Sequence, residues 1–162
     1  MRNSLFKCVR QNNLDGMILI LKEVVQCDDN STENALKMLR RRDAEGKLML
    51  QIALFYGFFE LSKYLLKEWP SHLEMLPVII DDMTVYHLAL GSAHQVPSLT
   101  IKHEEDNYIE IFTILSQTST FTGSQFGIDT KNRLGQTPLM LVAKLGFPRL
   151  AEHLIKEMKA SI

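Results

Sequence analysis

Two segments of the sequence share one pattern, and such internal repetition constrains the fold of a chain more strongly than its composition does. Residues 43–57 and 132–146 each open with a polar residue, carry a glycine three positions later, continue with apolar residues at helical spacing and end in another glycine. Weaker copies begin near Asn3 and Thr84. The sequence therefore predicts about four units, each a pair of helices joined by a tight turn.

The residues at the ends of the predicted helices have physical reasons for their positions. Thr137 can accept a hydrogen bond from a free N–H at a helix start, and Pro138 suits the first helical position because it lacks a donor. Gly57 and Gly146, and Asn12 less well, suit the left-handed turn that ends a first helix. Small residues are expected where the paired helices approach closely, at Ala53, Ala89 and Ala143. The apolar stripes expected on second helices are Leu61, Tyr64 and Leu65, then Ile111, Ile114 and Leu115.

The repeated pattern resembles the ankyrin repeat. Residues 84–89 retain the threonine, histidine and alanine of its Thr-Pro-Leu-His-x-Ala signature. The resemblance implies an all-α fold, an ankyrin-repeat solenoid of about four helix-turn-helix repeats that forms a single domain over residues 1–162. The expected repeats cover approximately residues 1–26, 43–75, 79–118 and 129–162, with a long insert at 91–106 in repeat three. Residues 33–39 could add a helical turn between the first two repeats.

Charge and cysteine content narrow the class of protein. The 162 residues include 18 Lys+Arg and 19 Asp+Glu, and the resulting net charge of −1 gives little reason to expect a nucleic-acid partner. Two cysteines cannot form a disulfide framework, and no leader follows Met1 and no apolar run is long enough to span a membrane. The expectation is a cytoplasmic protein, with the nucleus as a second compartment and no membrane partner.

No arrangement of residues predicts catalysis, a cofactor or a metal. The five histidines lack metal-ligand spacing, and His87 is expected to form a hydrogen bond within its own turn. His94 and His103 share the insert with the acidic run 104–106, which could ligate a divalent cation, but a solvated loop is the favoured interpretation. Cys8 is expected to be inert packing. A pocket at the insert histidines is the alternative that would make the protein an enzyme.

The basic run 40–42 precedes the turn of repeat two and raises the question of nucleic-acid binding. Lysine, arginine and acidic side chains are expected on the same edge, so the local field is predicted to be mixed. Besides the basic run they are Lys47, Lys131 and Arg133, and Asp43, Glu45, Asp81, Asp82 and Asp129. A nucleic-acid module is the alternative, and it would need Arg40, Arg41, Arg42 and Lys131 to form one stripe.

Partners of ankyrin-repeat proteins meet the tips of the turns and the exposed positions of the first helices, and the resemblance implies the same surface here. The partner-binding residues that it implies are Arg42, Glu45, Lys47, Phe55, Tyr56, Met83, Arg133, Leu134, Gln136, Lys144 and Leu145, with Arg10, Gln11 and Ala44 beside them. The apolar members of this set predict an anchor patch rimmed by charge. The alternative is that Phe55 and Tyr56 pack against repeat three or its insert.

The function implied by the resemblance is a non-catalytic protein-protein interaction module. Small stand-alone members of the family are regulatory or inhibitory subunits, and the favoured partner is a kinase. We expect a monomer that forms a hetero-complex and binds no cofactor. The alternatives are an inhibitor of a transcription factor, similar to the inhibitors of NF-κB, and a scaffold that uses the insert 91–106.

Overall fold

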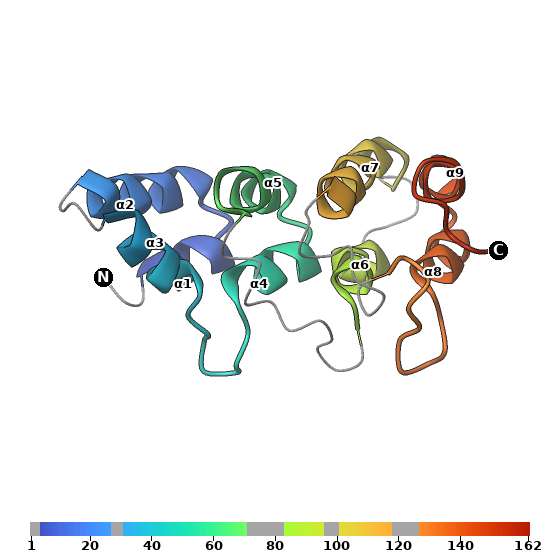
Figure 1. Cartoon of the computed structure of the whole chain (residues 1–162), viewed down its shortest axis with the longest axis horizontal. Coiled ribbons are helices and arrows are strands. Elements are labelled where there is room, and N and C mark those ends of the chain that lie inside the picture. Colours follow the sequence, from blue (N-terminus) through green and yellow to red (C-terminus); the bar gives the residue numbers. More distant parts are fainter. Residues whose placement is uncertain (1–3, 27–30, 71–82, 96–100, 118–126) are drawn as a thin grey trace. The chain divides into compact units, whose positions relative to one another are not determined.

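The computed structural model describes residues 4–26, 31–70, 83–95, 101–117 and 127–162 (Figure 1). Within these residues all longer regular elements are helical, which confirms the all-α class, and a β-bridge joins Arg42 to Leu48. The chain divides into two compact units, one of residues 1–53 and 58–76 and one of residues 54–57 and 77–162. None of the helices in the described part of the chain is both long and apolar enough to cross a lipid bilayer.

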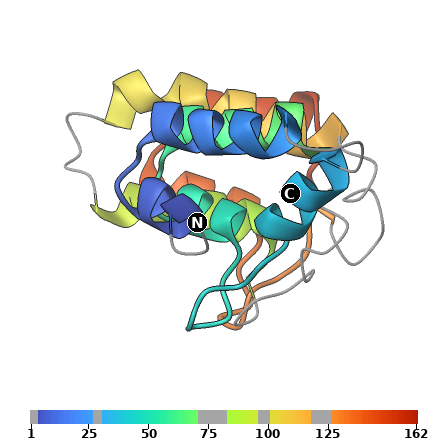
Figure 2. The same cartoon turned by 90° about the vertical axis from the view of Figure 1, so that its left-hand side faces the viewer.

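The first unit contains the helices of the amino-terminal part of the chain. Helix α2 (Leu14–Gln26) packs against α1 (Ser4–Arg10) and α3 (Ser31–Leu39), and Figure 2 shows α2 lying over α1. Helices α4 (Met49–Phe55) and α5 (Phe59–Glu68) follow, and the last residues of α4 belong to the second unit. Helix α3 confirms the helical turn expected at residues 33–39.

The second unit is built in two layers of helices. Helix α6 (Val85–Ala89) leads into a short 3-10 helix and then α7 (Ile101–Gln117). Helices α8 (Pro138–Leu145) and α9 (Pro148–Lys156) form the last pair. Because α6 packs against α7 and α8 while α9 also packs against α7 and α8, the first helices of the pairs form one layer and the second helices the other (Figure 1).

Aromatic rings fill the space between these layers. The rings of Tyr86 in α6 and Phe112 in α7 lie 5.1 Å apart, and those of Tyr108 in α7 and Phe147 before α9 lie 5.2 Å apart. All four are buried, which is where large aromatic side chains contribute most to stability. The expected stripe on α7 is confirmed by burial of Ile111 and Leu115, and that on α5 by Leu61 and Leu65.

Three of the helix pairs are joined by the same left-handed turn. Its central residues are Asn12 (φ 51°), Gly57 (φ 68°) and Gly146 (φ 75°). In each turn the next N–H donates to a carbonyl five residues earlier, in the bonds from Asn13 to Cys8 (2.8 Å), Phe58 to Ala53 (2.9 Å) and Phe147 to Val142 (3.2 Å). This pattern satisfies carbonyls that a helix end leaves free, and it confirms the predicted positions.

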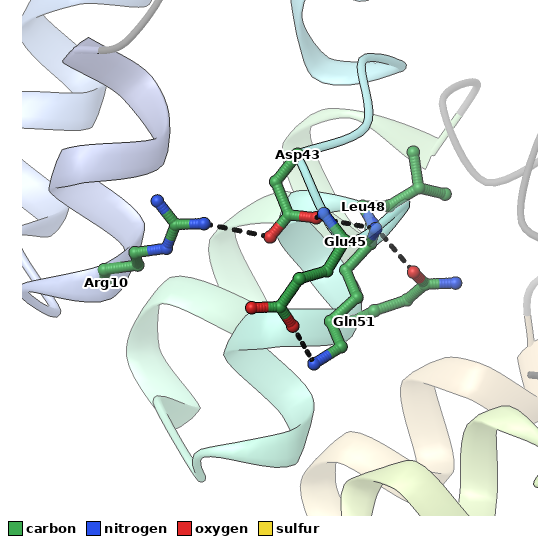
Figure 3. A network of polar contacts seen from close by, with 6 residues as sticks. Arg10, Asp43, Glu45, Leu48 and Gln51 are labelled. Carbon is green, nitrogen blue, oxygen red and sulfur yellow. Dashed lines mark hydrogen bonds and ion pairs between the residues drawn. The ribbon is translucent and has the colours of Figure 1, made fainter. Parts of the chain in front are cut away.

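The first helices begin with side-chain caps of two kinds. Thr84 and Thr137 each accept a hydrogen bond from the N–H three residues later, as expected for Thr137. Helix α4 lacks a threonine there, but Gln51 Oε1 accepts the Leu48 N–H at 2.7 Å (Figure 3). Gln51 therefore supplies the returning half of a capping box, which the sequence analysis missed.

His87 connects the start of α6 to a later turn of the same unit. Its Nδ1 accepts the Thr84 N–H at 3.2 Å, as part of the hydrogen bonding expected within its own turn. Its Nε2 lies 2.9 Å from the Gln136 carbonyl and donates to it. Both bonds need the neutral ring protonated at Nε2. Burial lowers the pKa of His87 from its ordinary value of 6.5, although the bond to Gln136 acts in the opposite direction.

The predicted insert is more ordered than the expected loop. Residues 91–95 form a 3-10 helix and residues 101–106 are the first turns of α7, while residues 96–100 lie outside the described part of the chain. Glu105, 3% exposed, accepts the Leu150 N–H of α9 at 2.8 Å. Asp106 forms an ion pair with Arg149 at 2.6 Å. The loop interpretation is therefore wrong for residues 101–106. The start of α9 has no side-chain cap of its own, so the carboxylates of Glu105 and Asp106 in α7 pair with its first residues instead.

One small-residue prediction is also wrong. Ala53 and Ala89 are buried as expected, but Ala143 is exposed and Val142 occupies the buried position of α8. Val142 and Ala143 are neighbours, and either could occupy the buried position. The larger Val142 is the one that is buried, which is consistent with the favourable free energy of burying apolar area.

We expect the stability of the protein to depend on pH through His87. The unfolded chain binds a proton more readily than the folded one, so the contribution of neutral His87 is complete above pH 6.5 and is lost as the pH falls toward the lowered pKa. The measurement is urea unfolding between pH 7.5 and 5 for wild type and His87→Gln, the residue type found at the equivalent position 51. The free energy of unfolding should fall more steeply for wild type, and parallel curves would contradict this role.

Candidate functional site

A tight surface turn precedes α4 in the first unit. Asp43 Oδ1 accepts hydrogen bonds from the N–H groups of Glu45 (2.9 Å) and Lys47 (2.8 Å). The Asp43 N–H donates to the Lys47 carbonyl at 2.9 Å, and the Gly46 N–H donates to the Asp43 carbonyl at 3.0 Å. Gly46 has φ 79°, a conformation that favours glycine. One side chain thus holds the whole turn.

The second unit contains the same turn before α8. Asn132 Oδ1 accepts the N–H groups of Leu134 and Gln136, both at 3.0 Å. The Asn132 N–H donates to the Gln136 carbonyl at 2.9 Å, and the Gly135 N–H, at φ 73°, donates to the Asn132 carbonyl at 2.9 Å. Each of the four hydrogen bonds described for the first turn has its counterpart here. The residues between these anchors are therefore held at fixed positions on the surface.

The two turns carry several of the side chains expected to bind a partner. Leu134 is 78% exposed and Tyr56, after α4, is 51% exposed. The other exposed members of the predicted set are Arg42, Glu45, Lys47, Arg133 and Lys144. The half-buried members are Phe55, Met83, Gln136 and Leu145. The structure brings Arg42, Glu45 and Lys47 together in the first unit, and Arg133, Leu134 and Gln136 together in the second.

Phe55 is held by packing within the second unit. A Cβ atom on Gly91 would lie 2.7 Å from the Phe55 ring, so the glycine and the ring are in close contact. The rings of Phe55 and Tyr56 also pack edge to face, with their centroids 5.2 Å apart. Phe55 has two interpretations, an anchor for a partner or a side chain that packs against repeat three or its insert. The close contact between Phe55 and Gly91 supports the packing interpretation.

The first unit also has a surface groove with a volume of about 620 Å³. It is lined by Phe6, Lys7, Arg10, Gln11, Arg41, Arg42, Asp43 and Ala44. Four of these side chains are cationic and one is acidic, so the groove carries a net positive charge. The side chain of Asp43 is only 5% exposed, and Glu45 forms an ion pair with Lys47 at 2.7 Å. The mixed field expected along the whole edge stays a prediction, because Asp81 and Asp82 lie outside the described residues and Asp129, Lys131 and Arg133 belong to the second unit.

Asp43 is charged but turned inward. Burial alone would raise the pKa of this carboxyl, but hydrogen bonds from the Lys47 and Glu45 N–H groups and the Arg10 guanidinium, 3.0 Å away, hold its pKa below the ordinary 3.8 (Figure 3). The Arg10 guanidinium also lies 5.9 Å from the centre of the Phe6 ring. Sequence reasoning missed Phe6 and Lys7 because nothing local indicates that α1 lines this groove.

The alternative sites of the sequence analysis find little support in the described residues. Nowhere in them do three His, Cys, Asp or Glu side chains lie close enough to hold a metal ion. The side chains of His94 and His103 lie outside the described part of the chain. The residues that the nucleic-acid alternative would need belong to different units, with Arg40, half-buried, in the first and Lys131 in the second. Cys8 is buried, as expected.

Neither a protein-family model, nor a curated protein, nor a solved structure matches this chain with significance. The turns, the exposed side chains on them and the groove are therefore the features that support a functional proposal.

We expect the turn of the first unit to depend on an acceptor at residue 43 rather than on its charge. Asp43→Asn keeps the acceptor that Asn132 provides in the second turn, so its free energy of unfolding should stay near that of wild type. Asp43→Ala removes the two hydrogen bonds from the backbone and the one from Arg10, and should lower it by about 1–2 kcal/mol. Urea denaturation measures both, and equal losses in the two variants would argue against the shared turn geometry.

Proposed function

We propose that this chain is a non-catalytic, ankyrin-type repeat module that binds a partner protein. The recurrence of one structural unit carries the proposal: a side-chain-held turn, a short first helix, a left-handed turn and a second helix. The turns at residues 43–47 and 132–136 have the same hydrogen bonds, and the helix pairs after them have the same connection. Repeated helix pairs of this kind gain stability from stacking and bind through the surface they share.

The bond from His87 to the Gln136 carbonyl supports the stacking of neighbouring repeats. It joins the first helix of one pair to the turn before the next pair, so it holds these two neighbouring repeats of the second unit together. The two helical layers of the second unit fit the same arrangement. In that unit the first helices α6 and α8 lie in one layer, and the resemblance implies partner binding through first helices and the turns before them.

Leu134 is the side chain that most favours a protein partner. It is 78% exposed at a turn that its own backbone N–H helps to hold, through the bond to Asn132. An apolar side chain fixed in water has a favourable free energy to gain from burial, about 1.5–3 kcal/mol for a full leucine. Exposed charged neighbours such as Arg133 fit the polar rim that surrounds a buried anchor at an interface.

The resemblance makes a kinase the first partner class to test, with the protein as its regulatory or inhibitory subunit. A transcription factor is the second class. Both would meet the same turns and first helices, so one set of surface variants serves for both. A scaffold role for residues 91–106 has less support, because Glu105 and Asp106 already hold α9 within the fold.

The test is affinity capture of proteins from the native source by wild type and by Leu134→Asp. We expect the variant to lose at least one bound protein about tenfold, because a buried anchor would become a buried charge. Leu19→Asp is the matched control: Leu19 is 60% exposed on α2, belongs to neither turn, and should leave capture unchanged. Equal recovery of every protein by all three would refute binding through the turn, provided their thermal unfolding curves agree.

A further inference from the structure

We propose that the groove of the first unit binds an acidic peptide segment of the partner, through Lys7, Arg10, Arg41 and Arg42. The inference rests on the proposed function, since it assigns chemistry to part of the same partner. It goes beyond that function by naming a ligand class and a site that the turns do not define.

The first argument is the concentration of positive charge. Four cationic side chains from α1 and from the segment before the turn line one groove of about 620 Å³, on a chain whose net charge is −1. Such a local excess raises the association rate and affinity for an oppositely charged partner. Asp43, the single carboxylate in the lining, is engaged by two backbone N–H groups and by Arg10, so little of its charge faces the groove.

The second argument is that two of the four cations, Arg10 and Arg42, are held in place yet keep donors to spare, while the other two are unengaged in the described part of the chain. Arg42 donates to the Gly46 carbonyl at 2.8 Å and Arg10 donates to Asp43 at 3.0 Å, and a guanidinium has five N–H donors in all. Lys7 and Arg41 are exposed, and neither forms an ion pair with another described residue. Preorganised cations with unused donors bind a carboxylate at a lower entropic cost than flexible ones.

The third argument distinguishes a peptide from a nucleic acid. Single-stranded nucleic acid is bound by aromatic side chains on which bases stack, and the only ring in this lining, Phe6, is 8% exposed. Ala44 and the exposed part of Phe6 instead add a small apolar area to the lining. Acidic side chains alternating with a small apolar residue match that arrangement.

The test uses a fluorescein-labelled peptide of sequence Glu-Asp-Leu-Glu-Asp-Leu-Glu-Asp and its neutral counterpart Gln-Asn-Leu-Gln-Asn-Leu-Gln-Asn, with fluorescence anisotropy as the readout. Wild type should bind the acidic peptide at least about tenfold more tightly than the neutral one, and added salt should weaken the binding. The double variant Lys7→Glu/Arg41→Glu should lose at least about tenfold. Neither side chain has a structural bond among the described residues, so the fold should persist in circular dichroism.

The matched control is Lys22→Glu/Lys37→Glu, which changes the net charge equally at exposed positions on α2 and α3. It should bind within about twofold of wild type, because an exposed i,i+4 pair such as Lys37–Glu33 contributes little. Equal losses in both double variants would overturn the proposal, since net charge rather than the groove would then govern binding. A single-stranded oligonucleotide of eight thymidines that bound more tightly than the acidic peptide, and lost affinity in the groove variant, would overturn it in favour of nucleic acid.

Affinity capture separates this proposal from the proposed function. If Leu134→Asp loses a partner while Lys7→Glu/Arg41→Glu retains it fully, the groove proposal fails and the protein-binding function stands. If the groove variant loses a partner that Leu134→Asp retains, the groove proposal is supported and the role of the turn at 132–136 fails.

Discussion

The structure depends on how backbone N–H groups are satisfied where the chain turns at the surface. In each of the two turns one side-chain oxygen, from Asp43 or Asn132, accepts two N–H groups of the backbone that follows it. Without that acceptor these groups would bond only to water and the segment would sample many conformations. The acceptor fixes the turn, the turn sets where the next helix begins, and the helix pair can then pack against its neighbour.

A rigid turn also explains how a chain without a recognisable catalytic centre in its described residues can have a specific function. Side chains at fixed positions lose less conformational entropy on binding than side chains on a flexible loop. Leu134 is therefore exposed at a position that the second turn holds fixed. The cations of the groove lie beside the first turn, which is held in the same way. The two units offer different chemistry, an exposed leucine in one and a cationic groove in the other, and under the proposed function this difference would help to distinguish one partner from another.

The sequence predicted the features that depend on neighbouring residues. The left-handed positions at Gly57 and Gly146 and the cap at Thr137 follow from the conformational needs of a helix end, which the residues themselves reveal. The cap from Gln51 was also within reach, because glutamine at the third helical position is half of a capping box. The exposure of Leu134 was predicted from its place at the tip of a repeat.

Features that join distant parts of the chain were not predictable in the same way. Glu105 reaches the start of α9 across forty-five residues, and nothing near either position indicates the bond. The positive groove depends on where α1 lies relative to the turn at residues 43–47, because this packing brings Lys7 and Arg10 to Arg41 and Arg42. Long-range packing decided both cases, and a single sequence carries no direct signal of it.

Amide hydrogen exchange of the two turns, followed by NMR, tests the central claim most directly. The account predicts that the N–H groups of Glu45, Lys47, Leu134 and Gln136 exchange at least about tenfold more slowly than those of Ala44 and Arg133 beside them, because a side-chain oxygen accepts each of the four. Exchange of all six at the rate of an unstructured chain would contradict the shared turn and the repeat architecture built on it.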